Sequence, residues 1–580
     1  MATYIRLVDY KSADEKEKGF FDKKNRYFTN TNSYEIIPGK IYAYWMLPEV
    51  AHAFVEYCAL RDIAAVKNGM STTDNNRFVR WWYECGINNI GFGCENAEKS
   101  VATGKKWFPY NKGGEYRKWY GNIGLVVNWK NNGQEIKKAA EGASGGRIVS
   151  QEYYFMQSVS WSKVSAGKFS LRLYPTGFLF DVAGPGIFTD YDTQKYIMGV
   201  INSRISKFCL QELYPTMNYE MGQVSSFPIY IDDSIKQYVS GIVEENISLS
   251  KDDWDVKETS WDYTKNTLLN GGQSLADAYD IWDKQYKSRV SKIKENEECL
   301  NSLFLKAYGL ENKSEILETV DDITVLPLDL SADIKAFISY GVGCILGRYS
   351  LKEDGLIYAG GKWDESKYSE DFKPCEYGII PITENQYFEE DLCTRVIDFI
   401  KVVYGEDTLN ENLKFIAKAL KPDSYESPKK IIRDYLFNGF FDNHYQIYQH
   451  RPIYWQLDSG KAGGFRAIMY MHRFNENTLS TVRTEYIQEL LYKYEDEIQR
   501  LQHKLGDAKT TAEKNEVKKQ ATAIDKKLVE CTVYDDLLNH VTSSIQNYVF
   551  DLDDGVKTNY AKFLSIDGDK TKNVLTVIKL

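Results

Sequence analysis

Residues 484–548 carry a long helical pattern with one interruption, at Gly506 and Asp507. Two helices joined by so short a turn lie antiparallel, so the pattern predicts a helical hairpin. Its charged side chains fall mostly into mixed i,i+4 pairs, which are typical of a solvated helix face. The simplest role for such a hairpin is a packing arm or a spacer.

The rest of the chain mixes strand-like and helical patterns. Short β-like runs separated by Gly, Asn and Lys clusters occupy much of residues 41–235, and a helical pattern follows them at 193–213. The predicted fold class is therefore mixed α+β. We divide the chain into a connector (1–40), an α/β domain (41–235), a helical spacer (236–320) and a mostly helical C-terminal domain (321–580).

Composition limits the classes of protein that fit. The 580 residues carry a net charge of −10, so any contact with nucleic acid must be local. Nine scattered cysteines without a CxxC pair argue against a zinc site and indicate reduced thiols in the cytoplasm. The sequence shows no signal peptide and no stretch long enough to span a membrane.

A basic and aromatic block stands out against the acidic background. Between Lys99 and Arg147 we count ten Lys and Arg against three Glu, a local charge of about +7. Cations suit phosphates and flat rings suit bases, so the block favours a nucleic-acid contact. The alternative is a solvated loop at a sheet edge whose tryptophans belong to the core.

A second polar cluster precedes the block, in the run STTDNNRFVRWWYE at 71–84. Thr and Asn side chains suit base edges or phosphates, and Arg77 and Arg80 would lie one helical turn apart. The same run also fits a helix capped by Thr73 or Asp74, with Phe78, Trp81 and Trp82 packed inward. The two interpretations are compatible.

Catalytic chemistry is not evident in the sequence. The glycine-rich run GVGCILG at 341–347 fits a helix packed through small residues better than a cofactor loop. None of the 13 prolines follows Asn and no Pro-Pro pair exists, so the Asn-Pro-Pro-aromatic loop that holds a flipped base for amino-methylation is absent. No metal-ligand cluster or Ser/His/Asp arrangement is apparent.

Long motifs in this chain resemble a known family, the PglX family of adenine-specific DNA methyltransferases of BREX phage-defence systems. The resemblance rests on runs such as TTDNNRFVRWWYE, KWFPYNKGGEYRKWYGN, SWSKVSAGKFSLRLYPTGFLFD, RPIYWQLDSGK and DDGVKTNYAKF, in family order from about residue 35 to the C-terminus. Members are about twice this length, with a catalytic half ahead of a target-recognition half. This sequence looks like the second half.

The resemblance implies a target-recognition domain at 41–235, like those of Type I specificity subunits, which present loops to the DNA major groove. The implied partners are double-stranded DNA, a methyltransferase catalytic domain and other BREX proteins. The chain alone is expected to be inactive, without bound metal or cofactor; S-adenosylmethionine would belong to the missing catalytic half. The expected DNA-binding residues are Thr73, Asn75, Asn76, Arg77, Arg80, Lys105, Lys106, Trp107, Tyr110, Lys112, Arg117, Lys118, Trp119, Tyr120, Asn122, Trp161 and Lys163.

Two functions follow as hypotheses. The first is the DNA-recognition part of an adenine-N6 methyltransferase. The second is a protein–protein scaffold whose acidic helical half docks other defence-system subunits, with the basic block binding an acidic partner surface. In the first case Lys112→Ala or Lys118→Ala is expected to reduce the salt dependence of DNA binding.

Overall fold

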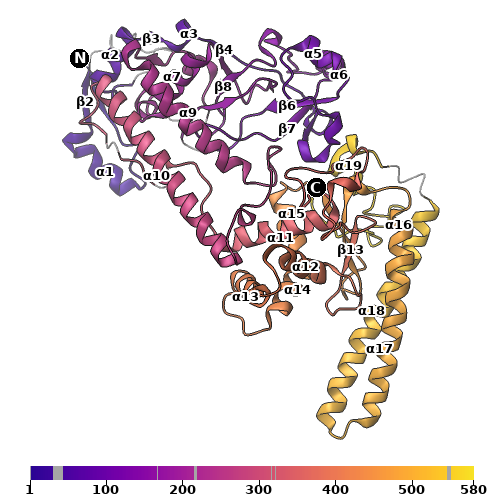
Figure 1. The fold of residues 1–580 in the computed structure, drawn as a ribbon. Helices are drawn as coiled ribbons and strands as arrows, with labels where there is room; N and C mark the ends of the chain where they lie inside the picture. The colour runs from indigo at the N-terminus through magenta and orange to yellow at the C-terminus, as the bar shows by residue number, and fades with distance from the viewer. Residues whose placement is uncertain are drawn as a thin grey trace. The chain divides into compact units, whose positions relative to one another are not determined.

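A computed structural model describes residues 2–29, 43–165, 168–214, 218–314, 317–319, 322–544 and 550–580. Helices and small sheets are mixed along the chain, which confirms the α+β class (Figure 1). The expected boundaries at 40/41 and 320/321 fall outside the described residues, and the four-part division remains a prediction.

The chain groups into two compact units, and neither is a single continuous stretch. Unit 1 comprises Met1–Val79, Gly91–Trp254 and Lys287–Leu326; unit 2 comprises Arg80–Ile90, Asp255–Tyr286 and Pro327–Leu580.

Two small sheets form the centre of unit 1. In the first, β6 (Trp107–Asn111) runs antiparallel to β7 (Leu125–Asn128) and parallel to β10 (Leu179–Phe180). In the second, β4 (Ala65–Lys67), β11 (Gly186–Phe188), β8 (Ser158–Ser160) and β9 (Arg172–Tyr174) pair antiparallel in that order. Strands β7, β8, β9 and β10 therefore confirm β structure in the predicted runs.

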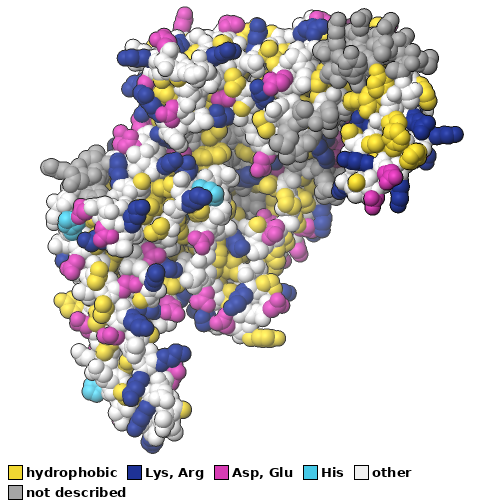
Figure 2. Space-filling model, turned by 180° about the vertical axis from the view of Figure 1, so that it is seen from behind, with side chains coloured by type: hydrophobic (Ala, Val, Ile, Leu, Met, Phe, Trp, Pro, Cys, Tyr) yellow, Lys and Arg dark blue, Asp and Glu magenta, His cyan; other side chains and the backbone are white. Residues whose placement is uncertain are grey.

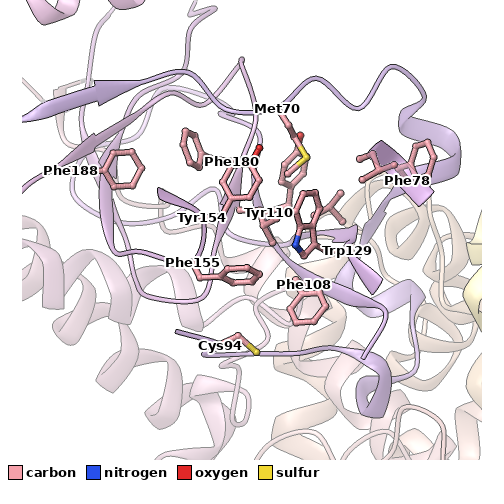
Figure 3. Close-up of a cluster of buried hydrophobic side chains, with 13 residues drawn as sticks. Met70, Phe78, Cys94, Phe108, Tyr110, Trp129, Tyr154, Phe155, Phe180 and Phe188 are labelled. Carbon is pink, nitrogen blue, oxygen red and sulfur yellow. The ribbon is translucent and has the colours of Figure 1, made fainter. Parts of the chain in front are cut away.

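Aromatic side chains hold these sheets together. Phe108, Tyr110, Trp129 and Phe180 are buried in one cluster, with Val127 and Ile136 (Figure 3). The helix α6 (Lys130–Glu141) follows β7 directly and contributes Ile136 to this cluster. Burial of so much apolar surface is the main stabilising contribution to the unit.

Three longer helices follow these sheets along the chain. The helix α7 (Tyr191–Asn202) begins at Asp190, whose carboxylate caps it, and lies within the predicted helical run. The long helices α9 (Asp233–Asp255) and α10 (Leu275–Ala307) follow, and both bear acidic residues that turn out to be buried. The expected closing strand is only Pro228–Ile229, β12.

Unit 2 is mostly helical. Its three-stranded antiparallel sheet has the order β13 (Ile379–Ile382), β15 (Arg466–Tyr470) and β14 (Tyr454–Asp458). Around it lie α11 (Leu330–Leu346), α12 (Leu392–Tyr404), α13 (Leu409–Leu420), α14 (Pro428–Asn438) and α15 (Phe440–Ile447).

The predicted hairpin is present in unit 2. The helices α17 (Gln488–Asp507) and α18 (Thr511–Ser543) run side by side as a paired arm (Figure 1). The turn falls at residues 508–510, a few residues after the predicted Gly506-Asp507, because Thr510 with Glu513 forms the capping box that starts α18. Residues 545–549 of the predicted hairpin lie outside the described part.

The short segment Arg80–Ile90 belongs to unit 2 through contacts with distant residues. The buried Glu84 carboxylate accepts the backbone N–H of Val556 at 2.9 Å, and an Arg80 guanidinium nitrogen donates to the Asp554 carbonyl at 3.1 Å. Among the described helices, none is both long and apolar enough to cross a bilayer.

Candidate nucleic-acid interface

The aromatic residues of the basic block lie in the core of unit 1. Trp107, Tyr110, Trp119, Tyr120 and Trp161 are all buried, with exposed fractions between 0 and 5%. All five residues of β6 are buried, and the Trp161 indole donates to the Tyr219 carbonyl at 3.0 Å. In this structure the rings pack in the core, which agrees with the alternative interpretation of the block. They offer no free face to a base.

Two cations of the block are buried in ion pairs with the long helices. Arg117 lies 2.7 Å from Asp253 of α9, and Lys118 Nζ lies 2.5 Å from Glu297 of α10. Burial opposes the charged form of Lys118, but Glu297, Tyr116 and Glu318 together outweigh it and raise the pKa of the amine. Both side chains are therefore structural here, and neither is exposed enough to meet a phosphate.

The residues that follow Lys118 form a tight internal turn. Trp119 and Asn122 have left-handed backbones, with φ of 68° and 57°. The Trp119 indole donates to Glu297 at 2.7 Å, and the Asn122 amide donates to the Glu115 carbonyl at 2.8 Å. These two hydrogen bonds stabilise the turn.

The remaining lysines of the expected set are partly covered. Lys112 Nζ lies 2.7 Å from Asp181, which also accepts the Tyr110 hydroxyl at 2.5 Å. Lys163 lies 3.0 Å from Glu220. Lys105 and Lys106 are half-buried, and Lys106 Nζ lies 5.2 Å from the Trp107 ring centroid.

The upstream cluster forms a capped helical turn, as one interpretation of the sequence predicted. Asp74 caps α4 (Asn75–Phe78) by accepting the Arg77 N–H at 3.0 Å, and Phe78 is buried. Thr73, Asn75, Asn76 and Arg77 are exposed.

The predicted helical spacing of Arg77 and Arg80 is wrong. The helix α4 ends at Phe78, and Val79–Trp81 form the extended strand β5, so a helical turn does not connect the two arginines. Arg80 belongs to unit 2, and Arg77 belongs to unit 1.

The exposed cluster is joined to the start of α6 by one ion pair. Arg77 Nε and Nη2 donate to Glu135 Oε1 at 3.1 and 2.5 Å, and these hydrogen bonds hold the pKa of Glu135 below its ordinary value. The other Glu135 oxygen accepts the Asn128 amide at 3.0 Å, and Asn128 Oδ1 accepts the Lys130 N–H at 3.3 Å. We call residues 73–77 and 130–138 the Arg77–Glu135 surface.

The Arg77–Glu135 surface is polar and carries more cations than acids. Arg77, Lys130, Lys137 and Lys138 stand against Asp74 and Glu135. Lys130 and Lys138 are exposed, and no ion pair to either is seen within the described residues. Such a surface can place cations on phosphates and amides on base edges.

Charge elsewhere does not form a broad basic field on the face drawn in Figure 2. Dark-blue cations and magenta acids are interspersed over that face. This distribution agrees with the net charge of −10 and with a small, local contact area.

Sequence reasoning missed the α6 side of this surface. Asn128, Lys130, Asn131, Asn132 and Glu135 were not among the expected site residues, although Asn-Asn-Gly directly after a strand is a strong turn signal.

The described structure bears on two possible sites, the glycine-rich run at 341–347 and a metal cluster. The run at 341–347 lies in and at the end of the buried helix α11, whose backbone N–H groups bond within the helix, so it does not fit a nucleotide or S-adenosylmethionine loop. Across the described ranges, no group of three or more His, Cys, Asp or Glu side chains is placed to hold a metal ion.

Sequence comparison places this chain beside two curated proteins. Adenine-specific methyltransferase PglX of Lacticaseibacillus casei (strain Zhang) is 39% identical over 584 residues, covering 97% of this chain and 48% of that protein. Adenine-specific methyltransferase BrxX of Escherichia coli O9:H4 (strain HS) is 34% identical over 601 residues, covering 97% and 47%. The chain thus spans about half the length of each relative, and no family model matches it.

Proposed function

We propose, from the premise that this chain is homologous over 97% of its length to the PglX and BrxX adenine-specific methyltransferases, that it is the DNA-recognition part of an adenine-N6 methyltransferase. The system it serves would be a BREX anti-phage defence system. The observation that carries the proposal is the Arg77–Glu135 surface, which exposes cations, amides and hydroxyls together on one compact unit.

Catalysis would come from the part of such proteins that this chain does not match. The chain covers about half of each relative, and it has no Asn-Pro-Pro-aromatic loop for a flipped base. We therefore expect no methyl transfer by this chain alone and no binding of S-adenosylmethionine. Isothermal titration calorimetry with S-adenosylmethionine tests this, and micromolar binding would contradict it.

DNA contact by the Arg77–Glu135 surface would divide into two roles. Lys130, Lys138 and Arg77 would lie against phosphates, where each neutralised phosphate releases counterions and makes binding salt-dependent. Thr73, Asn75 and Asn76 would lie near base edges, which carry the sequence information. Arg117 and Lys118, which are buried in ion pairs with α9 and α10, would not touch DNA.

The test is fluorescence anisotropy of this chain on a 20-base-pair duplex over a range of NaCl concentrations. We expect binding that weakens steeply with salt, and a slope of log K against log [NaCl] reduced by about one in Lys138→Ala. Lys418→Ala is the matched control, because Lys418 is likewise an exposed lysine on a helix but lies in unit 2. Absence of salt-sensitive binding by the wild-type chain would refute the proposal.

A second candidate function is a scaffold that docks other defence-system proteins. The observation in its favour is the hairpin α17–α18, which exposes Tyr492 by 73%, Val529 by 58% and Val533 by 65%. Exposed apolar residues of this kind mark protein–protein contacts. Partner proteins retained after nuclease treatment, together with absent DNA binding, would favour this function over the first.

A further inference from the structure

The corner at the start of α6, directly after β7, has a backbone that is not helical. Asn131, Asn132 and Gly133 have φ of 52°, 56° and 70°, so three consecutive residues are left-handed. Residues with a side chain adopt this conformation at a cost and normally one at a time, and Asn tolerates it best after Gly. Strained backbone of this kind persists where the surroundings fix it, and it is concentrated at functional positions.

The surroundings do fix this corner. The Gly133 N–H donates to the Trp129 carbonyl at 3.1 Å, and a Cβ at Gly133 would lie 2.5 Å from the Trp129 ring. Trp129 itself is buried in the aromatic cluster (Figure 3). Asn128, Glu135 and Arg77 extend the hydrogen-bonded chain to α4. The corner is therefore a rigid support.

The two asparagine side chains suit the left-handed backbone, but their amide groups are not used in the fold. Neither the Asn131 nor the Asn132 amide makes a hydrogen bond within the described residues, and Asn131 is exposed while Asn132 is half-exposed. The neighbouring asparagines differ. Asn111 bonds Ser160 and Gly184, Asn122 bonds Glu115, and Asn128 bonds Glu135.

We propose that Asn131 and Asn132 are sequence-determining residues that contact base edges of duplex DNA in the major groove, with adenine as the preferred base. An Asn amide can donate to N7 and accept from N6 of adenine at once, which is the pairing that discriminates adenine best. Both asparagines lie between the phosphate-binding candidates Lys130 and Lys138 in the sequence. This inference rests on the proposed function and adds the residues that select the sequence.

The experiment uses glycine at these positions, because Gly adopts positive φ without cost and removes only the amide. Asn131→Gly, Asn132→Gly and the double variant of this chain are incubated with a pool of random duplexes, and the bound fraction is sequenced. For the double variant we expect the preference for the selected over a scrambled duplex to fall about tenfold or more. Its affinity for the scrambled duplex is expected to stay within about twofold, because the phosphate contacts remain.

Ser565→Gly serves as the control, because Ser565 is also a side-chain residue at positive φ (64°) but lies in unit 2. It is expected to keep the wild-type sequence preference. Asn131→Asp provides a second test should a glycine variant fail to fold. Aspartate keeps the size and the turn conformation but lacks the donor and adds a negative charge, so it should change the preferred sequence and weaken binding.

The outcomes separate the inference from the proposed function. A double glycine variant that melts like wild type and keeps its sequence preference overturns the inference and leaves DNA binding standing. Wild-type binding without any enriched motif overturns the inference as well. A wild-type chain that binds no duplex in a salt-dependent way overturns the proposed function and the inference together.

Discussion

At the scale of one residue, Lys118 shows that a basic side chain can have a structural role inside a protein. Its amine and the Glu297 carboxylate are both buried and lie 2.5 Å apart, and Glu297 also accepts the Trp119 indole. Removing one partner of such a pair leaves an uncompensated charge in a low-dielectric interior, which costs far more than losing an exposed pair.

Lys118→Ala is therefore expected to lower the free energy of unfolding by about 3–5 kcal/mol. The measurement is urea unfolding followed by tryptophan fluorescence. The double variant Lys118→Met/Glu297→Met should lose less than the sum of the single variants, because it removes both charges. If Lys118→Ala kept the wild-type free energy of unfolding and reduced the salt dependence of DNA binding, Lys118 would instead be a phosphate contact.

The residues of the candidate interface were only partly predictable from the sequence. Thr73, Asn75, Asn76 and Arg77 were named in advance and are exposed, because a capping pattern is local and places its polar residues outward. The partners of Arg117 and Lys118 lie 136 and 179 residues away, and no local pattern indicates such a pair. Composition alone cannot distinguish a buried ion pair from a solvated cation.

At the scale of elements, the hairpin α17–α18 is attached to unit 2 near its base. The Glu530 carboxylate on α18 accepts Ser459 Oγ at 2.8 Å and the N–H groups of Ala462 and Gly464 at 2.7 and 3.0 Å. These three donors lie in the connection between β14 and β15. One side chain thus fixes the helical arm to the sheet and satisfies three polar groups of the loop.

Glu530→Ala is expected to reduce the free energy of unfolding by about 3 kcal/mol, because it leaves two backbone N–H groups and a hydroxyl without an acceptor. Chemical denaturation monitored by circular dichroism measures the change. Glu516→Ala is the matched control on the same helix. Glu516 is exposed and, within the described residues, accepts only from Gln520, so the free energy of unfolding should change by no more than about 0.5 kcal/mol. Equal losses in the two variants would contradict the attachment described here.

Elements with a strong local period were predicted best. The two helices of the arm were found within a few residues of their bounds, since their apolar and charged positions repeat regularly over many turns. The strand β6 was missed and was instead interpreted as part of a DNA-contacting block. All five of its residues are buried, so the alternation that marks a half-buried strand is absent.

At the scale of the whole molecule, the buried histidines make folding sensitive to acid. His472 is buried and bonded to the Cys85 carbonyl at 3.2 Å, and burial, with the nearby Arg348 charge, lowers its pKa to about 3. Burial likewise lowers the pKa of His444 well below its ordinary value, and His444 accepts two backbone N–H groups as a neutral ring.

The unfolded chain binds a proton at His472 below about pH 6.5, whereas the folded chain does not until about pH 3. Stability is thus full at neutral pH and falls as pH drops through this window. Between pH 7 and pH 5, His472 alone should reduce the free energy of unfolding by about 2 kcal/mol.

His472→Gln is the variant that tests this linkage. The variant should be less stable than wild type at pH 7. On acidification to pH 5, its free energy of unfolding should fall by about 2 kcal/mol less than that of wild type. Urea unfolding at the two pH values gives both quantities. The same acid sensitivity in the two proteins would mean that His472 does not contribute to it.

The hydrogen bond between Glu84 and Val556 joins residues that are 472 positions apart. A ribosome adds roughly 5–20 residues per second, so the segment around Glu84 would wait on the order of a minute before its partner exists. During that interval the Glu84 carboxylate and the Trp82 ring, both buried in the folded chain, remain uncovered on the nascent polypeptide. We therefore expect folding during synthesis to depend on chaperones that cover these groups until the late part of unit 2 has been made.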